Sequence, residues 1–172
     1  MQKLKKSYTC NASGCVKKHS THYCSLCKQS NSNHLSRNCP QAMHLYHVTY
    51  TCHGKKYVYL KPSINGNMGP GVYLTTLVEA IKIADFKAYD FDSGYEGAVV
   101  IKVAVNLGKL KQCSDLEPCP YFDIEQFNQQ KFDSATSIHE RWAGIDYPFR
   151  QWVVKNSEKL RVTDVWIMNG DL

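Results

Sequence analysis

Short runs in which hydrophobic and polar residues alternate recur after residue 43, and such alternation predicts β-strands. The run 45–51, LYHVTYT, is rich in aromatic and β-branched residues, and GPGVYLTT at 69–76 follows directly on a turn rich in Gly, Pro and Asn. A long strand is predicted over 98–113, and the pattern of 151–168 predicts a strand, a turn and a second strand. The apolar residues that share one face of the long strand are Val99, Ile101, Val103 and Val105.

One clear helix is predicted in the same part of the chain, over 77–89. Its apolar residues recur at a spacing of three and four, which is typical of one helix face: Leu77, Ala80, Ile81, Ala84 and Ala88. Thr75 or Thr76 would be its N-cap. A weaker helix is predicted near 123–131, after a loop with Pro118 and Pro120. Strands with one clear helix and few βαβ repeats favour an α+β fold over a doubly wound sheet.

The N-terminal segment carries a different pattern, which is rich in metal ligands. The sequence CSLCKQSNSNHLSRNCP begins at Cys24 and forms a C-x2-C-x6-H-x4-C array. Three thiolates and one imidazole are a ligand set typical of structural, tetrahedral zinc. The four candidate ligands are Cys24, Cys27, His34 and Cys39. The array resembles a zinc knuckle whose middle spacer is two residues too long.

A second set of candidate ligands precedes the first in a C-x4-C-x3-H-x2-H pattern: Cys10, Cys15, His19 and His22. One or two zinc ions are therefore predicted, and the pairing of the ligands is either sequential or interleaved. Few large apolar side chains lie before residue 43, so this segment needs a bound structural metal ion to fold. The change in composition near Pro40–Met43 predicts a zinc-binding module over 1–42 and a second domain over 43–172.

Charge is also distributed unevenly. Residues 1–78 carry ten Lys or Arg and no acidic side chain, and the first carboxylate is Glu79. The whole chain has 21 basic and 15 acidic residues, so the rest of it is net negative. This asymmetry predicts contact with a polyanion such as RNA or single-stranded DNA, with Tyr8 and Tyr23 available for base stacking. Metal-bound thiolates would offset part of the positive charge, which is the alternative interpretation.

The cellular location is constrained by what the sequence lacks. No apolar run approaches 18 residues, and the basic N-terminus is not followed by the apolar core of a signal peptide. We therefore expect no membrane partner, and a cytoplasmic or nuclear protein whose eight cysteines are reduced, so that metal binding is a more natural interpretation than disulfides for the clustered ones.

The order of the segments in the second domain resembles a known family. LYHVT, then MGPGVYLTT and a helix, then GAVVIKVAVNLGKLKQ and RQWVVKNSEKLRVTDVWI are similar to the catalytic domain of the poly(ADP-ribose) polymerase-like (PARP-like) ADP-ribosyltransferases. Within that superfamily the chain resembles the small interferon-induced PARP-like proteins of fish. The resemblance implies a split β-sandwich of the ADP-ribosyltransferase type, with NAD+ as the substrate.

The resemblance also implies roles for individual residues. His47 matches the family's His that binds the adenosine ribose, and Tyr73 matches the Tyr that stacks on nicotinamide. Gln151 stands where the family has a Glu that binds the other ribose and stabilises the oxocarbenium ion. Further residues expected in the NAD+ pocket, by the same matches, are Val48 in place of a Gly, Thr49, Gly71 and, for the second stacking aromatic, Phe86.

The replacement of Glu by Gln151 removes a negative charge from the position where positive charge develops during the reaction. The expected function is therefore transfer of single ADP-ribose units from NAD+ to protein or nucleic acid. The alternatives are a catalytically inactive module that binds NAD+ or ADP-ribose, and a zinc-dependent nucleic-acid-binding protein. The carboxylates of Glu140, Asp146 and Glu158 are candidates for the missing charge only if the match at Gln151 is out of register.

Overall fold

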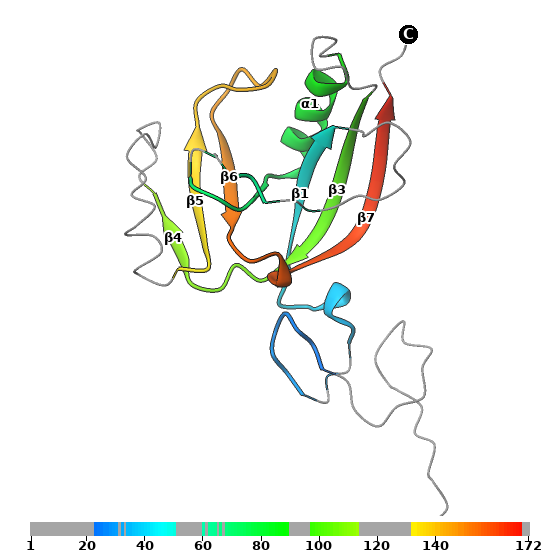
Figure 1. Ribbon diagram of the computed structural model, residues 1–172, viewed down its shortest axis with the longest axis vertical. Coiled ribbons are helices and arrows are strands. Elements are labelled where there is room, and N and C mark those ends of the chain that lie inside the picture. Colours follow the sequence, from blue (N-terminus) through cyan, green and yellow to red (C-terminus); the bar gives the residue numbers. More distant parts are fainter. Residues whose placement is uncertain are drawn as a thin grey trace, which may run out of the picture.

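The computed structural model describes residues 23–30, 32, 34–50, 60, 62–64, 66, 68–89, 97–113 and 132–169. In these ranges the chain forms one α-helix and seven strands, so the fold is mixed α+β (Figure 1). The elements in chain order are the 3-10 helix η1 (Ser36–Asn38), β1 (Met43–Tyr50), β2 (Val72–Leu74), α1 (Leu77–Ala88), β3 (Gly97–Val105), β4 (Leu110–Gln112), β5 (Ser134–His139), β6 (Phe149–Val154), the 3-10 helix η3 (Ser157–Lys159) and β7 (Leu160–Asn169).

The strands form two sheets that lie side by side in Figure 1. One sheet has the order β1-β3-β7 and is antiparallel throughout. The other has the order β2-β6-β5-β4, with β4 parallel to β5. The two sheets meet where Tyr46 of β1 and Thr75, just after β2, exchange both backbone hydrogen bonds at 2.9 Å.

The main core fills the space between the two sheets. The residues predicted to share one face of β3 (Val99, Ile101, Val103 and Val105) are all buried there, together with Leu45 of β1 and Val72 and Leu74 of β2. The period-two prediction for this strand is confirmed. Because His47 pairs with Ile101 in the antiparallel register, its side chain lies on the same inner face of the sheet.

Helix α1 packs on the opposite face of the three-stranded sheet. It begins after Thr76, one of the two predicted N-caps, whose hydroxyl contacts the Glu79 side chain. Ala80 and Ala84 are buried against Ala98 and Val100 of β3. The predicted apolar face was partly wrong, because Ile83 is buried whereas Leu77 and Ile81 are exposed.

The strand predicted over 98–113 is two strands in two different sheets. Gly108, at φ +57°, lies in the turn between β3 and β4, and a Cβ there would be 2.1 Å from the Asp133 carboxylate. The Asn106 side chain accepts a hydrogen bond from the Gly108 N–H at 2.9 Å and stabilises this turn. The chain thus crosses from one sheet to the other immediately after the long hydrophobic run.

Strand β5 was not predicted from the sequence. Its residues SATSIH show no apolar alternation, yet Ser134, Thr136 and Ser137 are buried. Their hydroxyls donate to the Leu107 carbonyl, the Gln151 carbonyl and the Met68 sulfur, respectively. Short polar side chains that find internal partners can be buried at little cost, and hydrophobic periodicity does not detect them. The predicted weak helix near 123–131 lies outside the described residues.

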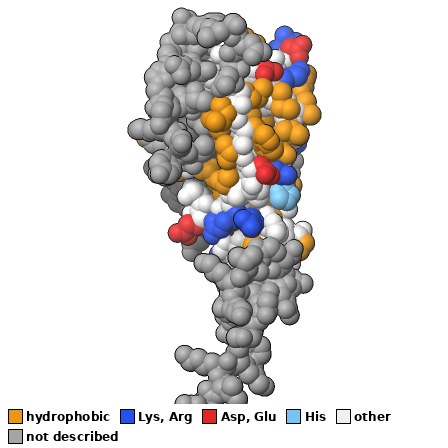
Figure 2. Space-filling view, turned by 90° about the vertical axis from the view of Figure 1, so that its right-hand side faces the viewer, with side chains coloured by type: hydrophobic (Ala, Val, Ile, Leu, Met, Phe, Trp, Pro, Cys, Tyr) orange, Lys and Arg blue, Asp and Glu red, His pale blue; other side chains and the backbone are white. Residues whose placement is uncertain are grey.

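The surface on the β7 side of the body gathers hydrophobic side chains, as Figure 2 shows. The exposed apolar residues of β7 are Val162, Val165, Trp166 and Ile167. Among the described residues, no helix has both the length and the apolar character needed to cross a lipid bilayer.

Candidate metal centre and ligand cavity

The first predicted ligand set lies in a compact turn structure below the two sheets in Figure 1. A turn over 25–27 reverses the chain, and Lys28, with φ 61°, lets its N–H bond the Cys24 carbonyl at 2.8 Å. The Cys27 N–H lies 3.5 Å from the Cys24 sulfur. The close Cys-x2-Cys pair therefore forms one side of a small loop with both sulfurs on the inside.

The other two ligands are held by the segment that follows. The hydroxyl of Ser32 donates to the His34 carbonyl at 2.7 Å, and η1 leads into Cys39, whose N–H bonds the Ser36 carbonyl. The Ser36 hydroxyl accepts from the Ser25 N–H at 2.8 Å, which ties the two halves of the loop together.

These contacts bring together the four donor atoms of Cys24, Cys27, His34 and Cys39, which all lie within 4.8 Å of one another. The Cys27 sulfur is 3.5 Å from Nε2 of His34. Ligands about 2.0–2.3 Å from a central tetrahedral ion lie roughly 3.3–3.8 Å apart. The donor set and its spacing therefore fit a metal ion, and the cluster could hold one.

Two of the thiols have pKa values that are shifted in opposite directions. Burial raises the pKa of Cys24, but hydrogen bonds from Cys27 and Leu26 outweigh this effect and lower it to about 6. Burial and the neighbouring sulfurs raise the pKa of Cys39 to about 11. A second thiolate beside the first would be disfavoured by repulsion, and a cation bound between them would relieve it.

The second predicted ligand set is not tested by the structure. Cys10, Cys15, His19 and His22 lie outside the described residues. The same holds for most of the basic side chains behind the polyanion prediction; of the ten, Lys28 and Arg37 are described, and both are exposed.

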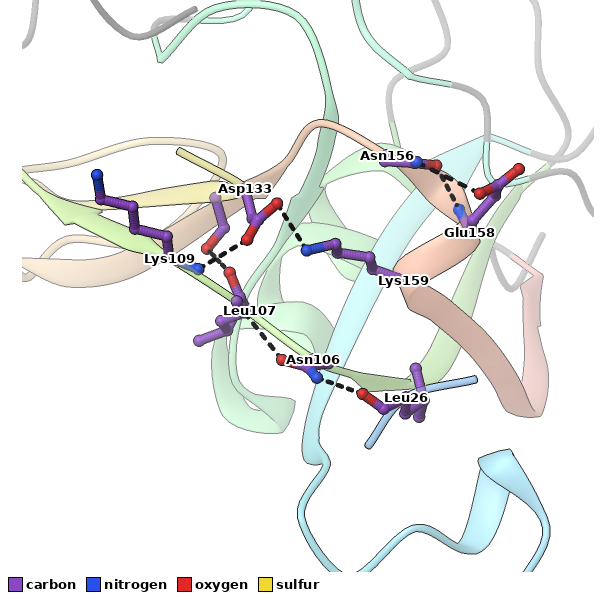
Figure 3. A network of polar contacts seen from close by, with 10 residues as sticks. Leu26, Asn106, Leu107, Lys109, Asp133, Asn156, Glu158 and Lys159 are labelled. Atoms are coloured by element: carbon purple, nitrogen blue, oxygen red, sulfur yellow. Dashed lines mark hydrogen bonds and ion pairs between the residues drawn. The ribbon is translucent and has the colours of Figure 1, made fainter. Parts of the chain in front are cut away.

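The segment from Cys24 to Cys39, here called the metal-ligand loop, is joined to the two sheets by packing and by polar contacts (Figure 3). Cys24, Leu26 and Cys39 pack against Ala104 of β3, and the Asn106 side chain donates to the Leu26 carbonyl. The Arg161 guanidinium donates to the Ser25 hydroxyl at 2.7 Å. Nearby, the Asp133 carboxylate accepts from the Lys109 N–H at 2.8 Å and pairs with the Lys159 ammonium at 2.6 Å.

A second candidate site is a cavity of about 360 Å³ that is lined by residues of both sheets, including Tyr46 and Thr75. Residues of β1, β2, β5, β6 and α1 contribute to its wall. The described lining residues that carry polar or aromatic chemistry are Tyr46, His47, Ser63, Tyr73, Thr75, Lys87, His139, Trp142 and Gln151. The three residues predicted to act on NAD+, namely His47, Tyr73 and Gln151, are all among them.

His47 enters the cavity wall from β1. Its Nδ1 lies 2.9 Å from the backbone carbonyl of Tyr73. A carbonyl only accepts, so Nδ1 carries the proton and Nε2 is left as a hydrogen-bond acceptor. Burial and the nearby Lys87 charge lower the pKa of His47, although the bond to the Tyr73 carbonyl opposes them. The imidazole is therefore neutral near pH 7, in one defined tautomer.

Tyr73 enters the wall from β2, and its hydroxyl is fully used by the protein. It accepts from the Met68 N–H at 2.7 Å and donates to the Gly69 carbonyl at 2.9 Å. A Cβ at Gly66 would lie 2.0 Å from this hydroxyl, so only glycine fits there. The hydroxyl proton is therefore used within the protein, and the ring is the main group that Tyr73 offers to a ligand.

Gln151 contributes from β6 and is 6% exposed. It pairs with Ser137 of β5, and its backbone carbonyl accepts from the Thr136 hydroxyl at 2.8 Å. None of the described residues that line the cavity is Asp or Glu. The three alternative carboxylates, Glu140, Asp146 and Glu158, are all exposed, and none lines the cavity.

The remaining predicted pocket residues divide into two groups. Val48 lines the cavity, whereas Thr49, Gly71 and Phe86 do not. Gly71 instead allows a close approach to β6, because a Cβ there would lie 2.8 Å from the Val154 carbonyl oxygen. Phe86 is 50% exposed on α1.

Trp142 and His139 are two of the lining residues that were not assigned to the pocket from the sequence. Trp142 begins a tight turn in which Ala143 and Gly144 have φ of 51° and 77°, and it exchanges backbone hydrogen bonds with Ile145. His139 ends β5 and stacks on Phe149, with ring centroids 5.7 Å apart. The register of the unpredicted strand β5 is what brings His139 to the cavity, so the sequence carried no signal for it.

The sequence matches no protein-family model and no curated protein.

Proposed function

We propose that residues 43–172 form a PARP-like domain that binds NAD+ in the cavity between the two sheets. The observation that carries the proposal is the convergence of His47, Tyr73 and Gln151, from three different strands, on one cavity. These are the residues that the resemblance assigns to the two riboses and the nicotinamide ring. The cavity, at about 360 Å³, falls in the usual range for small-molecule sites.

Each side chain offers a group suited to its proposed role. Nε2 of His47 is an acceptor and suits a ribose hydroxyl, which donates. The Tyr73 ring is fixed in place by the two bonds of its hydroxyl and suits stacking on an aromatic ring. The amide of Gln151 suits a second ribose hydroxyl. Trp142, rather than Phe86, is the candidate for a second aromatic wall.

The metal centre has a structural role in this proposal. Cys24, Cys27, His34 and Cys39 would hold one Zn²⁺, since three thiolates and an imidazole in a closed set are typical of structural zinc. Bound zinc would supply folding free energy to a segment with few apolar side chains.

Transfer of single ADP-ribose units is the second candidate function. Breaking the bond between nicotinamide and ribose leaves positive charge on the ribose, and Gln151 can bind a ribose hydroxyl there without neutralising that charge. Loss of one preorganised electrostatic contact typically lowers the rate by about 10²–10³-fold. Slow transfer to an acceptor, without chain elongation, is therefore the activity we expect from this site.

Calorimetry with NAD+ tests the proposed binding. His47→Leu and Tyr73→Ala should each weaken NAD+ binding, His47→Leu by roughly three- to tenfold, the usual net contribution of one hydrogen bond. Thr49→Val is the matched control, because Thr49 is on the same strand as His47 but does not line the cavity. Absence of NAD+ binding by folded, zinc-loaded protein would overturn the proposal.

Labelled NAD+ separates the two candidate functions. Label transfer by the wild-type protein would establish the transferase. If only Gln151→Glu transfers label, the wild-type domain binds without transfer and lacks just the carboxylate.

A further inference from the structure

The described wall of the cavity carries one side chain that is ionised near pH 7, that of Lys87. The two imidazoles that also line the cavity, those of His47 and His139, are neutral at this pH because burial lowers the pKa of each. None of the described lining residues is Asp or Glu. A charge beside a partly enclosed cavity is screened less than a charge in open water. The described wall therefore favours an anionic group of a ligand over a cationic one.

Helix α1 and strand β1 together place Lys87 at the cavity. Ile83 and Lys87 are one helical turn apart and both line the cavity, so the face of α1 that they share borders it. The Lys87 ammonium lies 3.9 Å from the centre of the Tyr50 ring, in a cation–π contact that holds the side chain along β1. Tyr50 follows His47 by three residues, which is about 10 Å along a strand. The flexible stem of a lysine can span much of this distance.

The electrostatics of His47 agree with this placement. Burial lowers the pKa of His47, and the positive charge of Lys87 adds to the effect. A positive charge opposes protonation of an imidazole only at short range, so the ammonium lies near the ring. A ligand group bound next to His47 is therefore also close to the charge of Lys87.

We propose that Lys87 binds the diphosphate of the dinucleotide and makes the cavity select nucleotides over nucleosides. The inference rests on the proposed function, which places the adenosine ribose at His47. The 5′ carbon of that ribose carries the diphosphate, which is the anionic part of NAD+. A lysine ammonium binds phosphate as a compact point charge with three hydrogen-bond donors.

Calorimetry with NAD+, on the full-length zinc-loaded chain, tests the inference. Lys87→Gln should weaken NAD+ binding by roughly ten- to hundredfold, the range expected for a hydrogen bond to a charged group. Lys87→Arg keeps the charge and should recover most of the affinity. Lys82→Gln is the matched control, because Lys82 is on the same helix, with its ammonium 4.6 Å from the centre of the Tyr147 ring, but does not line the cavity. Circular dichroism should confirm that the variants are folded.

A second comparison, between ADP and adenosine, isolates the phosphates. ADP should bind the wild-type protein at least about tenfold more tightly than adenosine, since only ADP reaches the ammonium with a negative charge. Lys87→Gln should reduce this preference by weakening the binding of ADP. A loss of packing at α1 would instead weaken both ligands and leave their ratio unchanged, and that result would overturn the inference.

The outcomes distinguish this inference from the proposed function. Equal binding of NAD+ by the wild-type protein and a folded Lys87→Gln variant would overturn the inference and leave the proposed function standing. Equal losses in Lys87→Gln and Lys82→Gln would show a general effect of the charge of the helix and would also overturn it. Failure of the wild-type protein to bind NAD+ would overturn the proposed function together with the inference.

Discussion

The metal-ligand loop and the ligand cavity are assembled in opposite ways. The four donor atoms of the loop come from sixteen consecutive positions, Cys24 to Cys39, and short turns bring them together. The cavity draws His47, Tyr73, His139 and Gln151 from four strands in two sheets. Ligand spacing along the chain therefore reveals the first site, whereas the second exists only after strands distant in sequence have paired.

The two regions also differ in what holds them together. Much of the apolar packing of the loop comes from the three cysteines among the candidate ligands, with Leu26 and Ala104 beside them. The cavity wall rests on a core of aliphatic residues between the sheets. We therefore expect the loop to depend on zinc and the cavity to depend on the sheets.

Loss of the metal is the largest effect that this comparison predicts. Cys27→Ala should abolish stoichiometric zinc binding, and with it apparent binding energy of about 10–16 kcal/mol that contributes to folding of the loop. Metal analysis and hydrogen exchange over 23–42 would measure the loss. Cys113→Ala is the matched control, because Cys113 is buried outside the ligand cluster. If zinc removal also abolished the β-sheet signal in circular dichroism, the independence of the two regions would be refuted.

Removal of the Tyr73 hydroxyl should have the next largest effect. Tyr73→Phe leaves the N–H of Met68, a fully buried residue, without its acceptor, and we expect a loss of roughly 1–3 kcal/mol in the free energy of unfolding. Urea denaturation measures this loss. The ring stays in place, so NAD+ affinity should change much less than in Tyr73→Ala. A ligand that instead bonds the hydroxyl would reveal itself by equal losses of affinity in both variants.

Two aromatic residues of nearly equal exposure provide a sharper test of the cavity. Trp142 is 49% exposed and lines the cavity, whereas Phe86 is 50% exposed and does not. Trp142→Ala should weaken NAD+ binding by about 0.5–1.5 kcal/mol, the usual range for an aromatic pair, and Phe86→Ala should leave it unchanged. Calorimetry on both variants measures the difference. The opposite ranking would favour the sequence-based assignment of Phe86 over the geometry.

The ion pair near the loop should give the smallest effect, and it should depend on pH. Burial would raise the pKa of Asp133, but hydrogen bonds from Lys159 and from the Lys109 N–H lower it. A carboxyl whose folded pKa is depressed stabilises the fold above its unfolded pKa, about 3.9, and loses this effect as the pH falls through the folded pKa.

Because the paired side chains are 25% and 35% exposed, solvent screening should limit the contribution to below about 1 kcal/mol. Asp133→Asn should thus be slightly less stable than wild type at pH 7 and equal to it near pH 2, by urea denaturation. A difference that persists at pH 2 would show that packing, rather than charge, is responsible.

The parts of the fold that could be predicted from sequence have a strong local or periodic signal. Val99, Ile101, Val103 and Val105 alternate, and they form one buried face as predicted. The Cys24–Cys39 array was predicted from spacing alone, and its donor atoms do converge. In both cases neighbouring residues in the chain carry all the information that is needed.

The parts that could not be predicted depend on contacts between distant residues. The polar sequence around Ser134 and Thr136 is typical of a loop. These residues are buried in a strand because their hydroxyls donate to the carbonyls of Leu107 and Gln151, which are distant in the sequence. Without β5 there was no basis for placing His139 beside Gln151. The turn after β3 likewise packs closely on Asp133, which lies far along the chain from Gly108.

Tyr46 and Thr75 exchange the two backbone hydrogen bonds that join the sheets at the cavity, and both residues line it. A ligand in the cavity would therefore shield these two amides from solvent directly, whereas the ladder bonds at the outer edges of the sheets would be unaffected. Ligand binding should then slow amide exchange at Tyr46 and Thr75 more than at the edge strands.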